Sequence, residues 1–577
     1  MLNTKKILQI LKDNNIYLLC FILFLTLLNT VLEIVGIGLI IPILGIFVGQ
    51  DYERYLSFLP FLKENYNTKA LIYVFVIFNL VYLLKFITSI FSILMRNKYY
   101  WNLYRNLSNK IFQNFINKDY LSHMTTHSAE KINTIKGEAN LFSFGVTSPF
   151  VDLIADIILL VSISIFLLVY DFKLSFFVII FFLLISFLWN RYYNKYLLNL
   201  GKMREKHAKE TIKEIQNSFG NFRETIMLGL RKLFFNRFQG HNKAFALIGV
   251  KRDTIIQLPR FLLELLSVTG IFLILFTLIK NNLPLSEILV LLGVIVFATL
   301  RMLPSVTKII RSIQTLKFNS VVVDKIHAEL SDYNSLNKKS EQKFDKFEFK
   351  KISLNDFNFK YPKTDKLILK KVNLEINKNE KIGIIGGTGS GKSTLINIIS
   401  GLIDEKNGLK VDGNFLDEKK IISWQSNVGY VPHDVFLLDE TIGYNISFQQ
   451  DYKNKEKNIL ELLHKVELLE FVENQPKKLE TVVGEKSSKL SRGQTQRLGI
   501  ARALYSKPQI LIFDEATSAL DVNTERKILK KLYDKSHDLT IISISHRKSA
   551  LEFCDKVFEI NDGQLEEIVN NLPFKSV

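Results

Sequence analysis

Cysteine is nearly missing from this 577-residue sequence, which contains only Cys20 and Cys554. Two cysteines provide neither a disulfide framework nor a cysteine metal cluster, so both are expected to be small buried hydrophobic side chains. Proline is also scarce, at 11 residues, which argues against a collagen-like chain. Hydrophobic residues make up 48% of the sequence, too many for a disordered chain.

The apolar residues are concentrated in roughly the first 300 positions. A helix needs about 20 mainly apolar residues to cross about 30 Å of hydrocarbon. Six runs predict such helices, although the fourth needs flanking residues to reach this length: residues 16–45, 70–95, 149–170, 174–189, 261–279 and 285–300. Residues 1–14 mix leucine and isoleucine with lysine and predict a short helix on the membrane surface, with an irregular charged tail as the alternative.

The formal net charge is +19, and its distribution predicts the orientation in the membrane. The connections at residues 96–138 and 191–260 are long and basic, whereas those at 51–69, 171–173 and 280–287 are short and mixed in charge. Positive loops remain in the cytoplasm, so we expect a multi-pass protein of the cell membrane with both termini cytoplasmic. Because the basic residues flank membrane spans, we expect no nucleic-acid partner.

The sequence divides into three parts. Residues 1–327 are expected to form an all-α transmembrane domain of six helices with cytoplasmic extensions. Residues 328–346 are polar and predict a linker. From residue 347 to residue 577, short β-like runs alternate with helical ones, which predicts a soluble α/β domain.

A glycine-rich loop in the third part predicts nucleotide binding. It follows the β-like run 381–385, precedes a helical stretch and fits the pattern G-x-x-x-x-G-K-[ST]. Glycines let backbone N–H groups wrap around phosphates, Lys392 can reach the β- and γ-phosphates, and Ser393 can ligate Mg²⁺. ATP and Mg²⁺ are therefore the expected cofactors. The loop comprises Gly386, Gly387, Thr388, Gly389, Ser390, Gly391, Lys392, Ser393 and Thr394.

Two further motifs follow the loop. A buried strand at 509–513 ends in Asp514, which suits the Mg²⁺-side carboxylate, and Glu515, which suits the base that polarises water. Ser491, Arg492, Gly493 and Gln494 precede a helical run, where Ser and Gly can form an anion site. Simple capping by Ser491 is the alternative interpretation.

With these motifs in this order, the segment from Tyr361 onward resembles the nucleotide-binding domain of an ATP-binding cassette (ABC) transporter. Six spans followed by one such domain resemble an exporter half-transporter, an ATP-hydrolysing translocase. The resemblance implies that Tyr361 stacks on adenine, and that Ser491 and Gly493 contact the γ-phosphate of ATP held by a partner domain. It also implies that Asp521 lies at the dimer seam and that His546 contacts the γ-phosphate. Since one set of motifs provides half of each site, we expect a homodimer, with a heterodimer as the alternative.

Two positions depart from the family pattern. His433 stands after Tyr430-Val431-Pro432, where the family usually has a glutamine that senses Mg²⁺ and the attacking water. Imidazole is a poorer Mg²⁺ ligand than an amide oxygen, which leaves a water-mediated role for His433. Arg492 replaces the usual glycine in the signature, where it either contacts phosphate or points to solvent. Glu515, His546 and His433 remain the expected catalytic residues.

Ionisable residues inside the spans are costly and suggest a substrate site. Arg260 and Arg301 could form a basic patch that binds a diphosphate. Together with Glu33, the segments around these arginines resemble flippases of lipid-linked oligosaccharides, so the expected substrate is an anionic polyprenyl-diphosphate glycan. The alternative is a purely structural role, in which these residues form ion pairs within the helix bundle, for example Arg260 with Glu264. Export of peptides or hydrophobic small molecules, or a regulatory or channel-like role, also stays open. The candidates are Glu33, Lys85, Asp152, Asp156, Arg260, Glu264 and Arg301.

Overall fold

The computed structural model divides the chain into two compact units, and each is considered by itself. The membrane unit comprises Met1–Lys118 and His123–Ser340, and the nucleotide-binding unit comprises Asp119–Ser122 and Glu341–Val577. The structure describes residues 4–39, 68–170, 172–280, 285–336, 346–362, 364–405, 408–416, 418–484, 489–534, 538–545 and 547–568.

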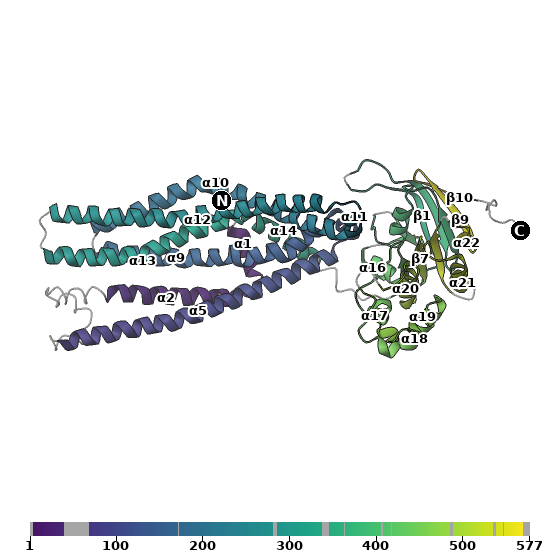
Figure 1. Ribbon diagram of the computed structural model, residues 1–577, viewed down its shortest axis with the longest axis horizontal. Helices are drawn as coiled ribbons and strands as arrows, with labels where there is room; N and C mark the ends of the chain where they lie inside the picture. Colours follow the sequence, from purple (N-terminus) through teal and green to yellow (C-terminus); the bar gives the residue numbers. More distant parts are fainter. Residues whose placement is uncertain are drawn as a thin grey trace. The chain divides into compact units, whose positions relative to one another are not determined.

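The described residues of the membrane unit form helices joined by short turns, and the long helices run alongside one another (Figure 1). At 1.5 Å per residue, helices of 49 and 50 residues such as α10 and α12 are far longer than a bilayer requires, so they extend beyond it. The helices are α1 (Thr4–Lys12), α2 (Ile16–Gly38), α5 (Thr68–Asn117), α6 (Tyr120–Thr125, whose first residues belong to the other unit), α7 (Ser128–Ile132), α8 (Ala139–Phe142), α9 (Ser148–Tyr170), α10 (Phe172–Gly220), α11 (Phe222–Met227), α12 (Arg231–Lys280), α13 (Leu285–Phe318) and α14 (Ser320–Leu336), with π-helical turns η2 (Asn133–Glu138) and η3 (Ser143–Thr147).

Four segments of the described residues are long and apolar enough to cross a membrane: Ile16–Gly36, Phe75–Asn117, Ser128–Ile165 and Arg231–Lys280. They contain most of the first, second, third and fifth predicted spans. The fourth and sixth predicted spans fall within α10 and α13, which are continuous helices there. Residues 40–45 of the first predicted span lie outside the described residues.

The ends of the membrane unit differ in detail from the sequence predictions. The predicted N-terminal helix is present as α1, but Ile7, Ile10 and Leu11 are buried in the protein, where α1 packs on α14. The predicted linker at 328–346 starts too early, because α14 continues to Leu336. Its apolar side chains, including Ile326 and Leu330, are buried in the core of the unit and hold the helix in place.

The nucleotide-binding unit contains two sheets among its described residues. One is antiparallel in the order β2-β1-β4-β5, and the other has the order β10-β9-β3-β8-β7-β6 with only β10 antiparallel to its neighbour. The strands are β1 (Lys351–Phe359), β2 (Leu369–Asn377), β3 (Lys381–Ile385), β4 (Lys410–Val411), β5 (Asn414–Phe415), β6 (Val428–Val431), β7 (Ile510–Asp514), β8 (Thr540–Ile544), β9 (Lys556–Asn561) and β10 (Gln564–Glu567).

Helices pack around the mainly parallel sheet, as expected for an α/β fold. Strands β3, β7 and β8 are apolar and almost fully buried, so they form the core of the unit. Because these strands are parallel, the segments that follow them meet at one edge of the sheet. The helices are α15 (Lys392–Ile399), α16 (Glu418–Asn427), α17 (Ile442–Ser447), α18 (Glu456–Lys465), α19 (Leu469–Glu473), α20 (Arg492–Tyr505), α21 (Val522–Leu532) and α22 (Lys548–Leu551), with 3₁₀ turns η4 (Tyr452–Lys455) and η5 (Lys478–Glu480).

Candidate functional site

The glycine-rich loop connects β3 to α15, and its backbone requires glycine. Gly386 has a φ of +149° and Gly391 one of +113°, a region that side chains rarely adopt. A Cβ atom on Gly386 would lie 2.4 Å from the carbonyl oxygen of Ile560, so the loop has no room for one. The Lys392 ammonium donates to the carbonyl oxygens of Gly386 (2.7 Å) and Gly387 (2.9 Å), which places its charge inside the curve of the loop.

The residues of this loop fit a nucleotide phosphate. The Ser390 hydroxyl oxygen is buried without a hydrogen-bond partner among the described residues, as expected of a group that faces a ligand. Gly387, Thr388 and Gly389 are exposed, so their backbone N–H groups are accessible to an anion. When ATP is bound, the loop would hold its phosphates, and Ser393 with Asp514 would hold Mg²⁺.

Asp514 and Glu515 lie where β7 ends, at the same edge of the sheet. The Tyr430 hydroxyl of β6 donates to a carboxylate oxygen of Asp514 at 2.9 Å, which fixes its orientation. Burial raises the pKa of Asp514, as expected for a carboxyl group removed from water. Glu515 has a φ of +51°, which is unusual for a residue with a side chain, and its N–H donates to Ile544 of β8.

His433 lies beside the predicted base Glu515. Its Nε2 atom is 4.0 Å from a carboxylate oxygen of Glu515, so no direct hydrogen bond joins the two side chains. His546, the other predicted catalytic histidine, lies outside the described residues. Its neighbour Arg547 was not singled out from the sequence, yet its guanidinium donates to the carbonyl oxygens of Thr517 and Leu520 and pairs with the buried Glu525.

The signature residues begin α20. Ser491 and Gln494 form a capping box, in which the Ser491 hydroxyl accepts from the Gln494 N–H and the Gln494 side chain accepts from the Ser491 N–H. The capping interpretation of Ser491 therefore holds within one chain. A Cβ atom on Gly493 would lie 3.2 Å from the Ala519 oxygen. Arg492 donates to Asp434 at 3.2 Å, so in this chain it pairs with a carboxylate.

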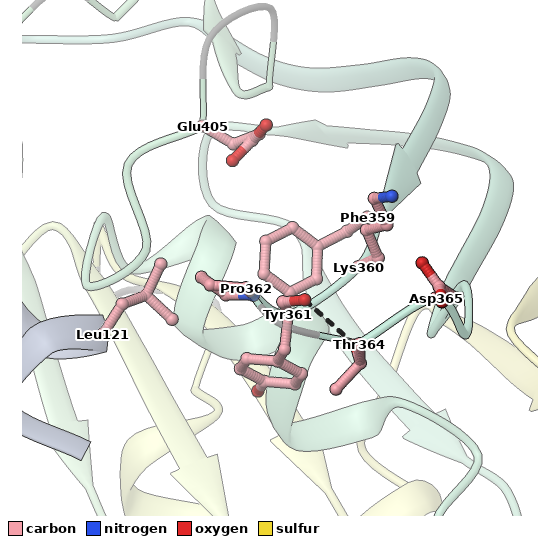
Figure 2. Close-up of a pocket in the computed structure, with 8 residues that line it drawn as sticks. All are labelled: Leu121, Phe359, Lys360, Tyr361, Pro362, Thr364, Asp365 and Glu405. Atoms are coloured by element: carbon pink, nitrogen blue, oxygen red, sulfur yellow. Dashed lines mark hydrogen bonds between the residues drawn. The ribbon is translucent and has the colours of Figure 1, made fainter. Parts of the chain in front are cut away.

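The predicted adenine platform Tyr361 is half-buried next to a cavity of about 440 Å³. Its hydroxyl bonds to that of Thr394 at 3.1 Å, and its ring packs edge-to-face on Phe359. The Thr364 hydroxyl donates to the Tyr361 carbonyl oxygen at 2.9 Å and fixes the turn (Figure 2). Leu121 and Glu405 also line the cavity. The cavity thus offers both apolar surface and polar groups next to the aromatic ring.

Asp521 has a structural role within one chain, because it caps α21. One of its carboxylate oxygens accepts from the Thr524 N–H at 3.0 Å. Hydrogen bonds from the backbone and side chain of Thr524 lower the pKa of Asp521, which keeps it charged. The role implied for it at a dimer seam stays a prediction.

The structure separates the charged candidates of the membrane unit into two groups. Lys85 forms an ion pair with Glu33, Arg96 pairs with Asp152 at 2.7 Å, and Lys308 lies 4.0 Å from Asp156. The first group consists of Lys85, Glu33, Asp152 and Asp156, which have charged partners inside the bundle. These side chains therefore match the alternative of pairing within the bundle.

The second group consists of Arg260 and Glu264. Both are exposed, and neither forms an ion pair with another described residue, so the suggested pairing between them is absent. The side chain of Arg301 lies outside the described residues, although its backbone belongs to α13.

Comparisons with known proteins agree with the fold. The family pattern "ABC transporter transmembrane region" matches residues 19–302, and the pattern "ABC transporter" matches residues 369–518. The chain is therefore an ABC transporter with a transmembrane region and an ATP-binding domain, which confirms the predicted fold class. It is a multi-pass membrane protein.

Individual relatives match mainly over about two fifths of the chain. An ATP-dependent lipid A-core flippase of Haemophilus influenzae is 34% identical over 234 residues, which cover 40% of this chain and 39% of that protein. ABC transporter B family member 6 of Dictyostelium discoideum is 33% identical over 254 residues, 43% of this chain and 37% of that protein. The chain thus matches well under half the length of these curated relatives.

A solved structure of a bacterial Atm1-family ABC exporter with ATP bound superposes with a TM-score of 0.73. The match covers 96% of this chain and 94% of that one at 19% sequence identity. At this identity the likeness concerns the fold alone, and it extends over both units.

Proposed function

We propose that the chain is half of a homodimeric ABC exporter that uses ATP hydrolysis to flip an anionic lipid across the cell membrane. The nucleotide-binding unit provides the phosphate loop, the Mg²⁺-side carboxylate and the general base of an ATPase. The relatives that are lipid A-core flippases support a lipid substrate. Within this class, we infer a polyprenyl-diphosphate glycan as the transported lipid.

The position of Arg260 carries the proposal. Most charged candidates in the membrane unit are neutralised by a partner, whereas the Arg260 side chain is exposed on α12 without an ion pair among the described residues. Leu263 of α12 and Met302 of α13 belong to one buried apolar cluster, so the two helices are aligned there. Arg260 lies one turn before Leu263, and Arg301 directly precedes Met302. Each arginine thus lies within one turn of a residue of this cluster, and guanidinium groups suit a diphosphate.

The experiment is ATPase stimulation in proteoliposomes by a polyprenyl diphosphate, compared with the same polyprenol without phosphate. We expect wild-type hydrolysis to rise with the diphosphate only. We expect the double variant Arg260→Gln, Arg301→Gln to keep its basal activity and to lose the stimulation, because both guanidinium groups would be missing.

The matched control is Arg252→Gln, which removes an arginine of the same helix that is paired with Asp253. Stimulation should survive in this control. Unchanged stimulation in the double variant would contradict the substrate assignment. Stimulation of the wild type by hydrophobic compounds or peptides alone would favour the alternative exporter class.

The homodimer and the orientation are part of the same proposal. Each chain carries one phosphate loop and one signature, and Ser491 and Gly493 begin α20 close to the loop of Ala519, where they would face the ATP of a second copy. The basic connections support a cytoplasmic location for the nucleotide-binding unit and both termini. Asp521 would then lie near the seam, and His546 would contact the γ-phosphate.

A further inference from the structure

Four charged or titratable side chains form a continuous series at the edge of the candidate site. The Arg492 guanidinium donates to Oδ1 of Asp434 at 3.2 Å, and Oδ2 of the same carboxylate lies 3.4 Å from Nδ1 of His433. Across the ring, Nε2 of His433 lies 4.0 Å from Oε2 of Glu515. The series therefore joins the first residue of α20 to the carboxylate that follows β7.

The carboxylate of Asp434 lies 3.4 Å from Nδ1 of His433, close enough to bear on which form the ring takes. An ionised carboxylate accepts hydrogen bonds but cannot donate them, so it favours the tautomer with the proton on Nδ1. The lone pair is then on Nε2, the atom that faces Glu515. A second residue that fixes the tautomer in this way is a common means of orienting a functional imidazole.

The gap between His433 and Glu515 suits one water molecule. A separation of 4.0 Å is too long for a direct hydrogen bond, but a water about 2.8 Å from each atom would bridge it with an angle of about 90° at its oxygen. Both flanking atoms are acceptors, so the water would donate both of its hydrogens. Its lone pairs would then point away from the two side chains, as a nucleophile requires.

We propose that Asp434 is a positioning residue for ATP hydrolysis, held by Arg492, which sets the His433 tautomer that orients the attacking water with Glu515. The Asp434 side chain is 83% exposed and would rotate freely without the arginine. An exposed ion pair adds about 0–1 kcal/mol to stability, so orientation is its main consequence. The two departures from the family pattern, His433 and Arg492, thus meet at one carboxylate. The proposal rests on ATP hydrolysis and not on the transported lipid.

The test is basal Mg²⁺-ATPase activity in detergent without added lipid, so the lipid assignment can fail independently. In Asp434→Ala we expect kcat to fall roughly 3- to 10-fold with an unchanged KM for ATP, a modest coupling between neighbouring residues. In a His433→Gln background the same substitution should have no effect, because an amide has no tautomer to select. Asp439→Ala, an exposed acid on the same segment, is the matched control and should match the wild type.

A binding measurement separates positioning from nucleotide affinity. In a Glu515→Gln background, a fluorescent ATP analogue should bind equally well to the protein that keeps Asp434 and to the protein that also carries Asp434→Ala. Asp434→Asn keeps the shape of the side chain, but its amide can donate to Nδ1, so its kcat should fall as in the alanine variant. If the alanine variant has a lowered melting temperature, the asparagine variant is the one that tests the proposal. Wild-type kcat in both variants, an equal loss in the His433→Gln background, or a loss confined to ATP affinity would each overturn the proposal.

Discussion

Glu138 in the membrane unit and Glu515 in the nucleotide-binding unit are held in different ways. Glu138 is buried, with a side-chain exposure of 1%, and its carboxylate accepts from Arg204 at 3.1 Å and from Asn133 at 3.0 Å. Glu515 is half-buried, and a left-handed backbone conformation at the end of β7 sets its direction. The first carboxylate is saturated by protein partners and is therefore structural. The second is placed by the backbone at the edge where the phosphate loop lies, which suits chemistry.

This difference predicts that the two carboxylates affect different properties. The largest effect should come from Glu515→Gln, which removes the general base and should lower kcat by about 10²-fold or more, since such a base contributes 10²–10⁴-fold. Phosphate release measures the rate. Glu566→Gln, an exposed carboxylate of β10, is the control. Activity within threefold of the wild type would exclude Glu515 as the base.

The same Glu515→Gln variant tests the homodimer, because it should retain ATP without hydrolysing it. With ATP present, light scattering of the purified protein should give the mass of two chains. The mass of one chain at every protein and ATP concentration would contradict the homodimer.

A second effect should appear in stability rather than activity. Arg204→Met leaves the buried Glu138 carboxylate without its charge partner, which typically costs about 3–5 kcal/mol of unfolding free energy. Thermal or denaturant unfolding in detergent measures this loss. Arg252→Met removes the arginine of the exposed pair with Asp253 and should cost less than about 1 kcal/mol. Equal losses of unfolding free energy in the two variants would show that burial does not determine how much each ion pair contributes to stability.

The smallest effect concerns the partly exposed pair Glu467–Lys531, at 2.6 Å. The hydrogen bond from Lys531 lowers the pKa of Glu467 below 4.5, so its stabilisation is present above pH 4.5 and is lost as the pH falls through the lowered value. Glu467→Gln should therefore cost about 0.5 kcal/mol at pH 7. Unfolding curves of both proteins should converge in acid. A difference that persists there would mean that the pair acts through packing.

The nucleotide site was easier to predict than the membrane unit. Its residues come in short consecutive runs at the ends of strands, because the phosphate loop follows β3 and Asp514 ends β7. The partners of Lys85 and Arg96 could not be predicted, because Glu33 and Asp152 lie 52 and 56 residues away on other helices. The linker was placed too early because a polar stretch hides the few apolar residues, such as Leu330, that hold α14 in the core.

The sequence alone determined two properties of this protein. The separation of apolar from polar residues indicated a membrane protein, and the scarcity of cysteine indicated that it has no disulfide framework. Local motifs also determined the phosphate loop and the carboxylates, because glycine conformations and strand ends are properties of short segments. Only the tertiary structure decided which charges are neutralised, since ion pairing depends on which helices pack together. It alone brought Arg492 to Asp434, which lies 58 positions earlier in the sequence and next to His433.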